Sequence, residues 1–199
     1  MTQVLLGDLV IGASSGQLVS FPTDTVPALA VRPQQSELIF AAKRRSQEKP
    51  LILMGAISNS LWPFVTGSQE EQQIWQQVAD RYWPGALTLV LPASEQVPSG
   101  MNPSNPTTIG LRVPNHAIAQ TILSQTGPLA TTSANRSGNP PLLTSAEIAA
   151  EFPEALTLLA EEWQYPATAI PSTVAQWTGE GWKILRQGAV KLESLFMIA

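Results

Sequence analysis

The basic residues of the chain give the first indication of its chemistry, because they are few and unevenly placed. Four of the eleven lysines and arginines lie between residues 43 and 49, in the segment KRRSQEKP. A solvated helix end is the simplest interpretation of such a charge cluster. The cluster also precedes an apolar run, and ligand-binding groups of α/β folds gather where helices and buried strands meet. Both interpretations stay open, and the second one predicts an anionic ligand.

A second group of polar residues follows an apolar run in the segment TTSANRSGNPP, residues 131–141. Small hydroxyl residues, a glycine and an amide placed directly after a strand can bring N–H groups and side-chain donors close to phosphate oxygens. An ordinary polar loop is the alternative interpretation. The glycine spacing fits neither a Walker A loop nor a dinucleotide fingerprint.

Two arginines lie within or directly after apolar strands, Arg112 in TIGLRVP and Arg186 in KILRQG. A guanidinium group in such a place must find a partner, because burying an unpaired charge is costly. A structural salt bridge and a carboxylate ligand explain Arg112 equally well, and the same two explanations apply to Arg186.

The segment GQLVSFPTDTVPALAV, residues 16–31, places three polar residues at the end of a buried strand. Thr23, Asp24 and Thr25 form a turn between predicted strands over 19–21 and 28–32. Bare hydroxyls at this point raise the question of what they contact.

Composition excludes several classes of chemistry. The chain has no cysteine, which excludes disulfides and thiolate nucleophiles, and one histidine, His116, which excludes a Cys/His metal cluster. His116 lies at a predicted helix start, which favours a surface or capping role over catalysis. The net charge of −4 argues against a general nucleic-acid coat. No secretory signal or membrane span is predicted, so we expect a cytoplasmic protein.

The pattern of the 199 residues predicts a single α/β domain, residues 1–199, with a twisted open mixed sheet and flanking helices. Capping boxes at Ser68/Glu71 and Thr144/Glu147 predict two helix starts. Asn115 is expected to cap a helix that stops at Gly127. Further helices are expected over 36–45 and from about Val190, and further strands within 50–56, 86–91, 107–113, 128–133, 172–177 and 181–188.

The motifs PTDTV, KRRSQEKPL, WPGALTLVL, TIGLRVP, TTSANRSG, STV and LRQG, taken in this order, resemble the YrdC family, whose best-known members are threonylcarbamoyl-AMP synthases. The resemblance implies a sheet with a broad, basic concave face. It implies that L-threonine, bicarbonate and ATP yield threonylcarbamoyl-adenylate and pyrophosphate, with Mg²⁺ assisting. The product would serve threonylcarbamoyladenosine (t6A) modification of tRNA, together with t6A-transfer proteins and possible contact with RNA.

The resemblance also implies roles for individual residues. Lys43 and Arg45 match the basic pair that holds the nucleotide phosphates and the carboxylate, and both are expected to serve catalysis. No residue is expected to bind a resident metal ion. The implied threonine contacts are Thr25, Arg112, Thr131 and Ser172, and the further nucleotide contacts are Lys49, Thr108, Ser133, Asn135 and Arg186.

One departure from the family pattern divides the functional hypotheses. The usual continuation PTDTVYGL is PTDTVPALA in this chain, so Pro27 replaces an aromatic residue and Ala28 replaces a glycine. Proline has no N–H donor, and alanine does not easily adopt a positive φ. The first hypothesis is an active threonylcarbamoyl-AMP synthase. The second is a YciO-like paralogue that binds nucleotide or RNA without this activity.

Overall fold

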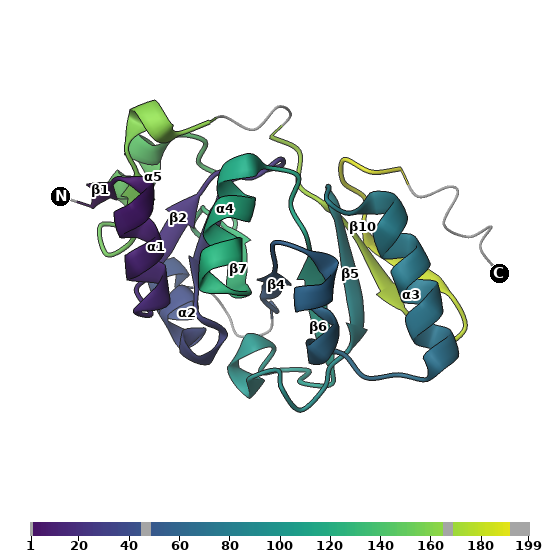
Figure 1. Cartoon of the computed structure of the whole chain (residues 1–199). Helices are drawn as coiled ribbons and strands as arrows, with labels where there is room; N and C mark the ends of the chain where they lie inside the picture. The colour runs from purple at the N-terminus through teal and green to yellow at the C-terminus, as the bar shows by residue number, and fades with distance from the viewer. Residues whose placement is uncertain (1, 45–48, 165–168, 192–199) are drawn as a thin grey trace.

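The structure is a computed structural model that describes residues 2–44, 49–164 and 169–191. Its strands form one ten-stranded sheet in the order β1-β8-β2-β3-β7-β4-β6-β5-β9-β10 (Figure 1). The strands are β1 (Gln3–Val4), β2 (Val19–Phe21), β3 (Ala28–Val31), β4 (Ile52–Met54), β5 (Leu87–Pro92), β6 (Thr108–Arg112), β7 (Leu129–Ser133), β8 (Leu156–Leu158), β9 (Thr173–Trp177) and β10 (Trp182–Arg186).

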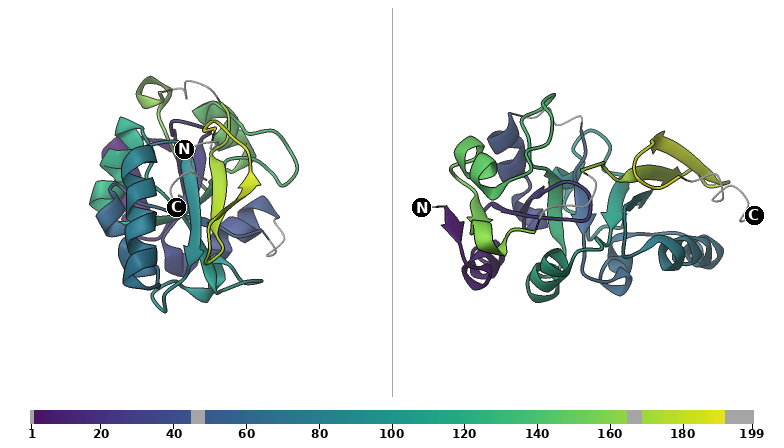
Figure 2. Two further views of the ribbon diagram at one scale, coloured as in Figure 1. Left: turned by 90° about the vertical axis from the view of Figure 1, so that its right-hand side faces the viewer. Right: turned by 90° about the horizontal axis from the view of Figure 1, so that it is seen from above.

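Helices lie on both faces of this sheet. Viewed from above, α1, α4 and α3 run along one face, whereas α2 and α5 cover part of the other face toward the β1 end (Figure 2). The helices are α1 (Leu6–Ser14), α2 (Glu37–Lys43), α3 (Gln69–Tyr82), α4 (Ala117–Thr126) and α5 (Ser145–Glu151), with 3-10 turns η1 (Pro33–Gln35), η2 (Ser58–Ser60), η3 (Trp62–Phe64), η4 (Ser99–Met101) and η5 (Ala160–Glu162).

The sheet is mixed, as the sequence predicts. A short turn joins β2 to β3, which pair antiparallel, and β3 pairs antiparallel with β7, whereas β4 pairs parallel with β6 and β5 pairs parallel with β9. Parallel pairs require a long connection. The chain passes through α3 and β5 between β4 and β6, and through the elements from β6 to β8 between β5 and β9. Within the described residues no helix is long and apolar enough to cross a membrane.

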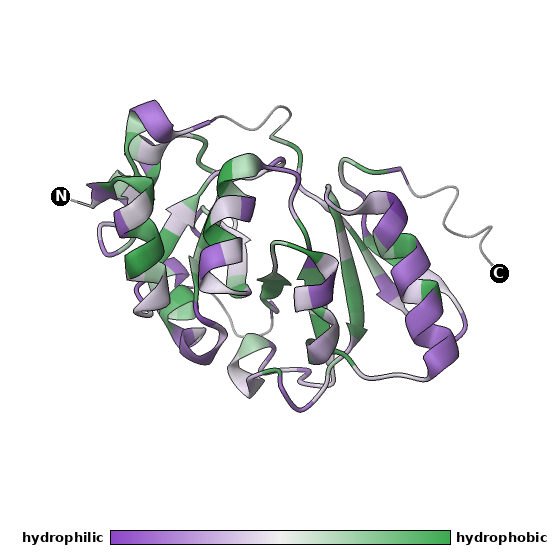
Figure 3. Ribbon diagram, in the orientation of Figure 1, coloured by the Kyte–Doolittle hydropathy of each residue, from purple (hydrophilic) through white to green (hydrophobic). Residues whose placement is uncertain are grey.

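The central strands place alternate residues on opposite faces of the sheet. Leu53 pairs with Leu111, Leu111 with Leu89, and Leu89 with Ala175, so this row crosses four strands, and every member of the row is buried. The neighbouring row, which consists of Ile52, Gly110, Val90 and Gln176, points to the other face because side chains of a strand alternate. Figure 3 shows the resulting contrast between the apolar central strands and the hydrophilic outer side of α3.

Local signals predict most elements correctly. Both capping boxes form, with Ser68 and Thr144 each accepting a hydrogen bond from the amide of the glutamate three residues later. α4 ends before Gly127, which has φ +76°. α2 is shorter than predicted, because Arg44 adopts a left-handed conformation directly after Lys43.

Two predictions about helices need correction or lie outside the described residues. The N-cap of α4 is His116 rather than Asn115, and the His116 side chain makes no capping hydrogen bond. Val190 and Lys191 are not helical, and the rest of the helix predicted from Val190 lies outside the described residues. No prediction covered β1, α1 or β8.

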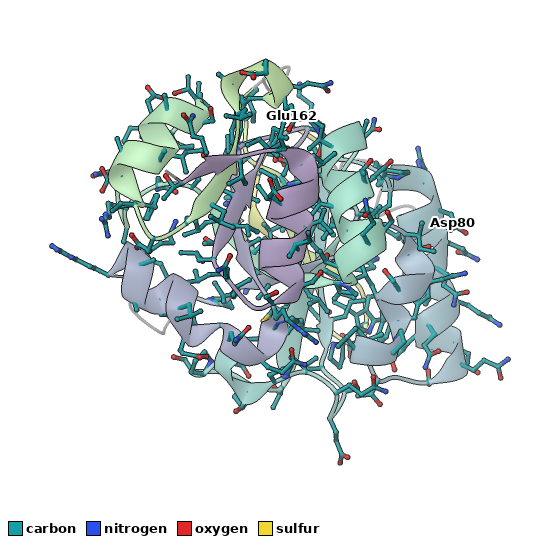
Figure 4. The ribbon with its side chains drawn as sticks, turned by 60° about the vertical axis from the view of Figure 1, so that its left-hand side comes forward. Asp80 and Glu162 are labelled. Carbon is teal, nitrogen blue, oxygen red and sulfur yellow. The ribbon has the colours of Figure 1, made fainter. Side chains whose placement is uncertain are left out.

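The start of α1 depends on a residue far away in the sequence. The amide of Leu6 donates a hydrogen bond to Oε2 of Glu162 over 2.8 Å, and Leu5 at the N-cap position offers no side-chain acceptor. Figure 4 shows Glu162 close to the start of α1, whereas Asp80 lies on α3 on the other side of α4. A carboxylate at a helix N-terminus satisfies a free N–H group and interacts favourably with the helix dipole.

Candidate functional site

A cavity of about 830 Å³ lies over the central strands, on the sheet face that carries Ile52 and Gly110. The floor is apolar in the middle, where Gly110 has no side chain and lies between Ile52 and Val90 in the same row. Polar groups border this floor on several sides. The predicted site residues that line the cavity are Thr25, Lys49, Thr108, Arg112, Thr131, Ser133, Ser172 and Arg186.

The turn after β2 is held by its own hydroxyl groups. Thr23 Oγ1 donates to the carbonyl oxygen of Val26 over 2.8 Å and lies 3.2 Å from Thr25 Oγ1. Because the hydrogen of Thr23 is used in this way, Thr25 must be the donor between the two hydroxyls. Thr25 Oγ1 in turn accepts a hydrogen bond from Nη1 of Arg112 over 2.8 Å. The hydroxyls at the end of β2 therefore orient a guanidinium group.

Arg112 forms a salt bridge and also remains available to a ligand. Its Nη2 lies 2.6 Å from Oδ1 of Asp24, and its Nε donates to the carbonyl oxygen of Gly85 over 3.0 Å. Arginine has five N–H groups, and Gly85, Thr25 and Asp24 engage three of them. Because two N–H groups of Arg112 have no partner among the described residues and Arg112 lines the cavity, the two explanations that the sequence left open are compatible.

Burial sets the electrostatics of this arginine. Removal from water lowers the pKa of Arg112 from its ordinary value, and the nearby Arg186 guanidinium lowers it further, while the Asp24 carboxylate opposes both effects. Partial burial also lowers the pKa of Arg186. A buried arginine beside one carboxylate and a second arginine is an environment that favours an additional anion.

Among the predicted basic residues that the structure describes, Lys43 is the most deeply buried, with 1% of its surface exposed. Its ammonium group donates to the carbonyl oxygen of Ser133 and to Oδ1 of Asn135, the latter over 3.3 Å. Ser133 Oγ also donates to Asn135 Oδ1 over 2.5 Å. Lys43 and Asn135 therefore lie behind the cavity wall that Ser133 forms, and the structure brings these three residues together. Arg45 lies outside the described residues.

The other end of the cavity carries a second hydroxyl cluster. Arg186 donates from Nε and Nη2 to the carbonyl oxygen of Ser172, over 3.1 and 2.8 Å, and from Nη2 to Ser172 Oγ over 3.2 Å. Ser172 Oγ lies 2.9 Å from Thr88 Oγ1. The serine is therefore fixed from both its backbone and its side chain.

Two further threonines differ in what they offer to a ligand. Thr131 donates its hydroxyl hydrogen to the carbonyl oxygen of Ile52 over 3.0 Å, so it connects β7 to β4. Thr108 Oγ1 instead accepts a hydrogen bond from Nδ2 of Asn102 over 3.3 Å, and within the described part of the chain no acceptor takes its own hydrogen. Asn102 was not predicted as a site residue.

Pro27 and Ala28, the two residues that depart from the family pattern, both line the cavity. The Pro27 carbonyl oxygen accepts a hydrogen bond from the amide of Ala134 over 2.8 Å, so the turn is connected to the loop after β7. Ala28 begins β3 in a regular pair with Ser133 and does not have a positive φ. The substitution of glycine therefore causes no backbone strain at this position.

His116 lies outside the cavity and supports the non-catalytic interpretation. Burial lowers the pKa of His116 from its ordinary value, while the Asp24 charge and a hydrogen bond to the Gln164 backbone oppose this effect. Within the part of the chain that the structure describes, no group of three or more histidine, cysteine or acidic residues could hold a metal ion.

Several residues that line the cavity were missed by the sequence analysis. Thr88 and Gln176 stand at alternate positions of apolar strands, and a polar residue there is a signal for a solvated face. Ser104 and Asn105 lie in the Pro/Ser/Asn-rich loop before β6, where composition alone does not distinguish them from their neighbours.

Comparisons with known proteins agree with this fold. Residues 13–188 match the Sua5/YciO/YrdC family model, described as "Telomere recombination". The threonylcarbamoyl-AMP synthase of Pyrococcus abyssi is 34% identical over 184 residues, covering 90% of this chain and 53% of that protein. The enzyme of the same name from Photobacterium profundum is 32% identical over 160 residues, covering 78% of this chain and 85% of that protein.

A solved structure of a similar protein has the same fold. The crystal structure of P. abyssi Sua5 complexed with L-threonine superposes with a TM-score of 0.81 at 31% identity, covering 96% of this chain and 57% of that chain. This chain thus spans a little over half the length of the Pyrococcus proteins. Because the family model matches nearly the whole chain, this protein belongs to the Sua5/YciO/YrdC family.

Proposed function

We propose that this protein is a threonylcarbamoyl-AMP synthase, which uses L-threonine, bicarbonate and ATP. The observation that carries the proposal is one cavity with Arg112 and Arg186 on its lining at one end and Lys43 directly behind the Ser133 wall at the other. Ser133, supported by Lys43 and Asn135, lies on β7, and Arg112 lies on β6 with Ser172 beside β9. The names of the family relatives support this choice of reaction.

The chemistry explains why these residue types suffice. The amine of threonine adds to carbon dioxide from bicarbonate, giving an N-carboxylate and releasing a proton. One oxygen of this carboxylate then attacks the α-phosphorus of ATP, and the bond to pyrophosphate breaks. The protein has to hold two anions together and stabilise the charge that develops, for which cations and hydroxyl donors are suited.

The remaining parts of the proposal follow from these substrates. Mg²⁺ would enter with ATP, with phosphate oxygens as its main ligands, which fits a cavity whose polar lining consists of hydroxyls, amides and cations. The product would serve t6A modification of tRNA together with t6A-transfer proteins. The proposal also has the protein contact tRNA and work in the cytoplasm.

The test is formation of threonylcarbamoyl-adenylate, detected by mass spectrometry together with pyrophosphate, from MgATP, L-threonine and bicarbonate. Both products should require all three substrates. Lys43→Met should raise KM for ATP at least about tenfold, because the Ser133–Asn135 wall loses its charged donor. Lys183→Met, which removes an exposed lysine on β10, is the matched control and should change nothing. The absence of both products at high enzyme concentration would contradict the proposal.

The second candidate is a YciO-like paralogue that binds nucleotide or RNA without the synthase activity. Pro27 and Ala28 on the cavity lining favour it, because an aromatic wall and a glycine are replaced at this point. Calorimetric titration of L-threonine should compare the wild type with the double variant Pro27→Tyr/Ala28→Gly, in the presence of bicarbonate and a non-hydrolysable MgATP analogue. Binding by the double variant alone would support this candidate.

A further inference from the structure

Thr88 is a polar residue at the centre of the sheet for which the motifs imply no role. It lies on β5 with 0% of its surface exposed, and its neighbours on the strand are leucines. Its hydroxyl makes one hydrogen bond among the described residues, to Ser172 Oγ at 2.9 Å. Burying a hydroxyl on an apolar strand is costly unless it forms a hydrogen bond. The contact with Ser172 therefore offsets the cost of burying the Thr88 hydroxyl.

Burial decides the direction of this contact. Whichever hydroxyl donates, the hydrogen of the other has no acceptor among the described residues, and a ligand can reach it only on a side chain that keeps some exposed surface, which is Ser172 at 2% and not Thr88 at 0%. Leaving a buried donor unsatisfied costs about 1–3 kcal/mol. Thr88 is therefore the donor and Ser172 Oγ the acceptor.

Ser172 Oγ then receives a second hydrogen bond from Arg186. Nη2 of Arg186 lies 3.2 Å from Ser172 Oγ, and an arginine side chain can only donate hydrogen bonds. A serine oxygen has two lone pairs, and Thr88 and Arg186 use both. The one hydrogen-bonding function that Ser172 has left is its own hydrogen. The cluster thus converts a serine, which in general can donate or accept, into a group that only donates.

The position of the cluster identifies the ligand group. Leu89 of β5 pairs with Leu111 of β6 in an antiparallel pair. By the same register Thr88, the residue before Leu89, lies opposite Arg112, the residue after Leu111. Ser133 lies on β7, three strands away in the order β7-β4-β6-β5, which corresponds to roughly 14 Å at about 4.8 Å per strand. Ser172, which bonds to Thr88, therefore lies at the Arg112 end of the cavity and not at the Ser133 end.

We propose that Thr88 is a positioning residue for the carboxylate of the amino-acid substrate. It holds Ser172, together with Arg186, as an obligate hydrogen-bond donor beside Arg112. A carboxylate oxygen is an acceptor only, so it matches this arrangement, whereas a ligand group that must donate is rejected. The inference rests on the proposed function and adds a residue that acts through Ser172.

The experiment is a double-mutant cycle read by calorimetric titration of L-threonine, with bicarbonate and a non-hydrolysable MgATP analogue present. Thr88→Val keeps the shape of the side chain and removes its donor. It should raise the threonine Kd on the order of threefold to tenfold, which corresponds to one ordinary hydrogen bond. Thr88→Ser should restore the wild-type Kd. The Kd of the ATP analogue, titrated separately, should stay within about twofold.

The cycle distinguishes positioning from structural support. If Thr88 acts only through Ser172, Thr88→Val should have no further effect on threonine binding in a Ser172→Ala background. Thr157→Val is the matched control, because Thr157 is also a fully buried strand threonine and its Oγ1 has no hydrogen-bond partner among the residues that the structure describes. It should leave both Kd values unchanged.

The outcomes separate this inference from the proposed function. Additive effects of Thr88→Val and Ser172→Ala, an equal loss of ATP-analogue binding, or unchanged threonine binding by Thr88→Val would each overturn the inference alone. Failure of the wild type to bind L-threonine would overturn the proposed function and the inference together.

Discussion

What a single side chain in this site can offer to a ligand depends on which of its donor hydrogens are already bonded within the protein. Arg112 illustrates the point, because Gly85, Thr25 and Asp24 engage three of its N–H groups and hold the guanidinium in one orientation. The sequence indicates that a buried arginine must have a partner, but it does not identify the partner. Asp24 and Arg112 are 88 residues apart, and only the folded sheet brings them together.

The Asp24–Arg112 pair makes a quantitative prediction. Asp24→Asn keeps an acceptor but removes the charge beside an arginine whose side chain is 4% exposed. We expect the free energy of unfolding at pH 7 to fall by about 3 kcal/mol, because one buried charge loses its partner. Urea denaturation measures this change.

The matched control is the more exposed Arg136–Glu151 pair, whose side chains are 29% and 40% exposed. Glu151→Gln should cost less than about 1 kcal/mol, because water screens this pair. Equal losses for Asp24→Asn and Glu151→Gln would show that Asp24 is not a buried charge partner.

Whole helices and strands follow local signals where those signals are complete within a few residues. Both capping boxes are predicted because the serine or threonine and the glutamate are three residues apart. The helix α1 was not predicted, because the carboxylate at its start, Glu162, is 156 residues away. Likewise, His116 replaces Asn115 at the start of α4, since the backbone of the preceding loop decides where the helix begins.

The capping box of α3 predicts a pH dependence. Hydrogen bonds from the Ser68 amide and the Trp177 indole lower the pKa of Glu71 from its ordinary value. A lowered pKa in the folded state stabilises the protein above the ordinary pKa, and this stabilisation is lost as the pH falls through the folded-state value. The difference in unfolding free energy between wild type and Glu71→Gln should therefore be largest near pH 7.

The measurement is urea denaturation at a series of pH values. The difference should shrink as the pH falls below the ordinary glutamate pKa of about 4.3 and disappear at lower pH. Glu70→Gln changes an exposed glutamate in the same helical turn and is the control for a general charge effect on the helix. A difference that grows toward acid pH would contradict the assignment.

At the scale of the whole molecule, the sheet separates packing from ligand binding. Leu111 belongs to the buried row, and Val90, on the next strand, belongs to the cavity row. Leu111→Ala should lower the free energy of unfolding by about 3 kcal/mol, because it leaves a void in a closed core. Val90→Ala should cost about 1 kcal/mol or less, because its side chain borders the open cavity.

Ligand binding should be affected more by Val90→Ala than by Leu111→Ala, which is the reverse of their effects on stability. Val90→Ala should change the Kd of the MgATP analogue or of L-threonine, whereas Leu111→Ala should leave both unchanged at a temperature where the variant is folded. Calorimetric titration and urea denaturation of the same two proteins test both halves. Similar effects of the two variants on binding would contradict the separation of the faces.

The sequence accounts for much of the fold and for part of the site. Motif positions such as Ser133, Arg112 and Ser172 lie on the cavity because each stands at or near the end of a predicted strand. Thr88 was not predicted, although its place among leucines is a visible signal, because its role depends on Ser172, 84 residues later. The partners of buried polar groups are the part of the site that strand and helix patterns do not specify.

The separation of a buried row from a cavity row across β4, β6, β5 and β9 has a consequence for the evolution of this sequence. Ile52, Gly110, Val90 and Gln176 share a face that contributes little to the closed core, so exchanges there alter the binding surface while the buried leucine row keeps the fold. New ligand preferences can therefore be selected one strand position at a time. A combinatorial library limited to these four positions would consist largely of folded proteins.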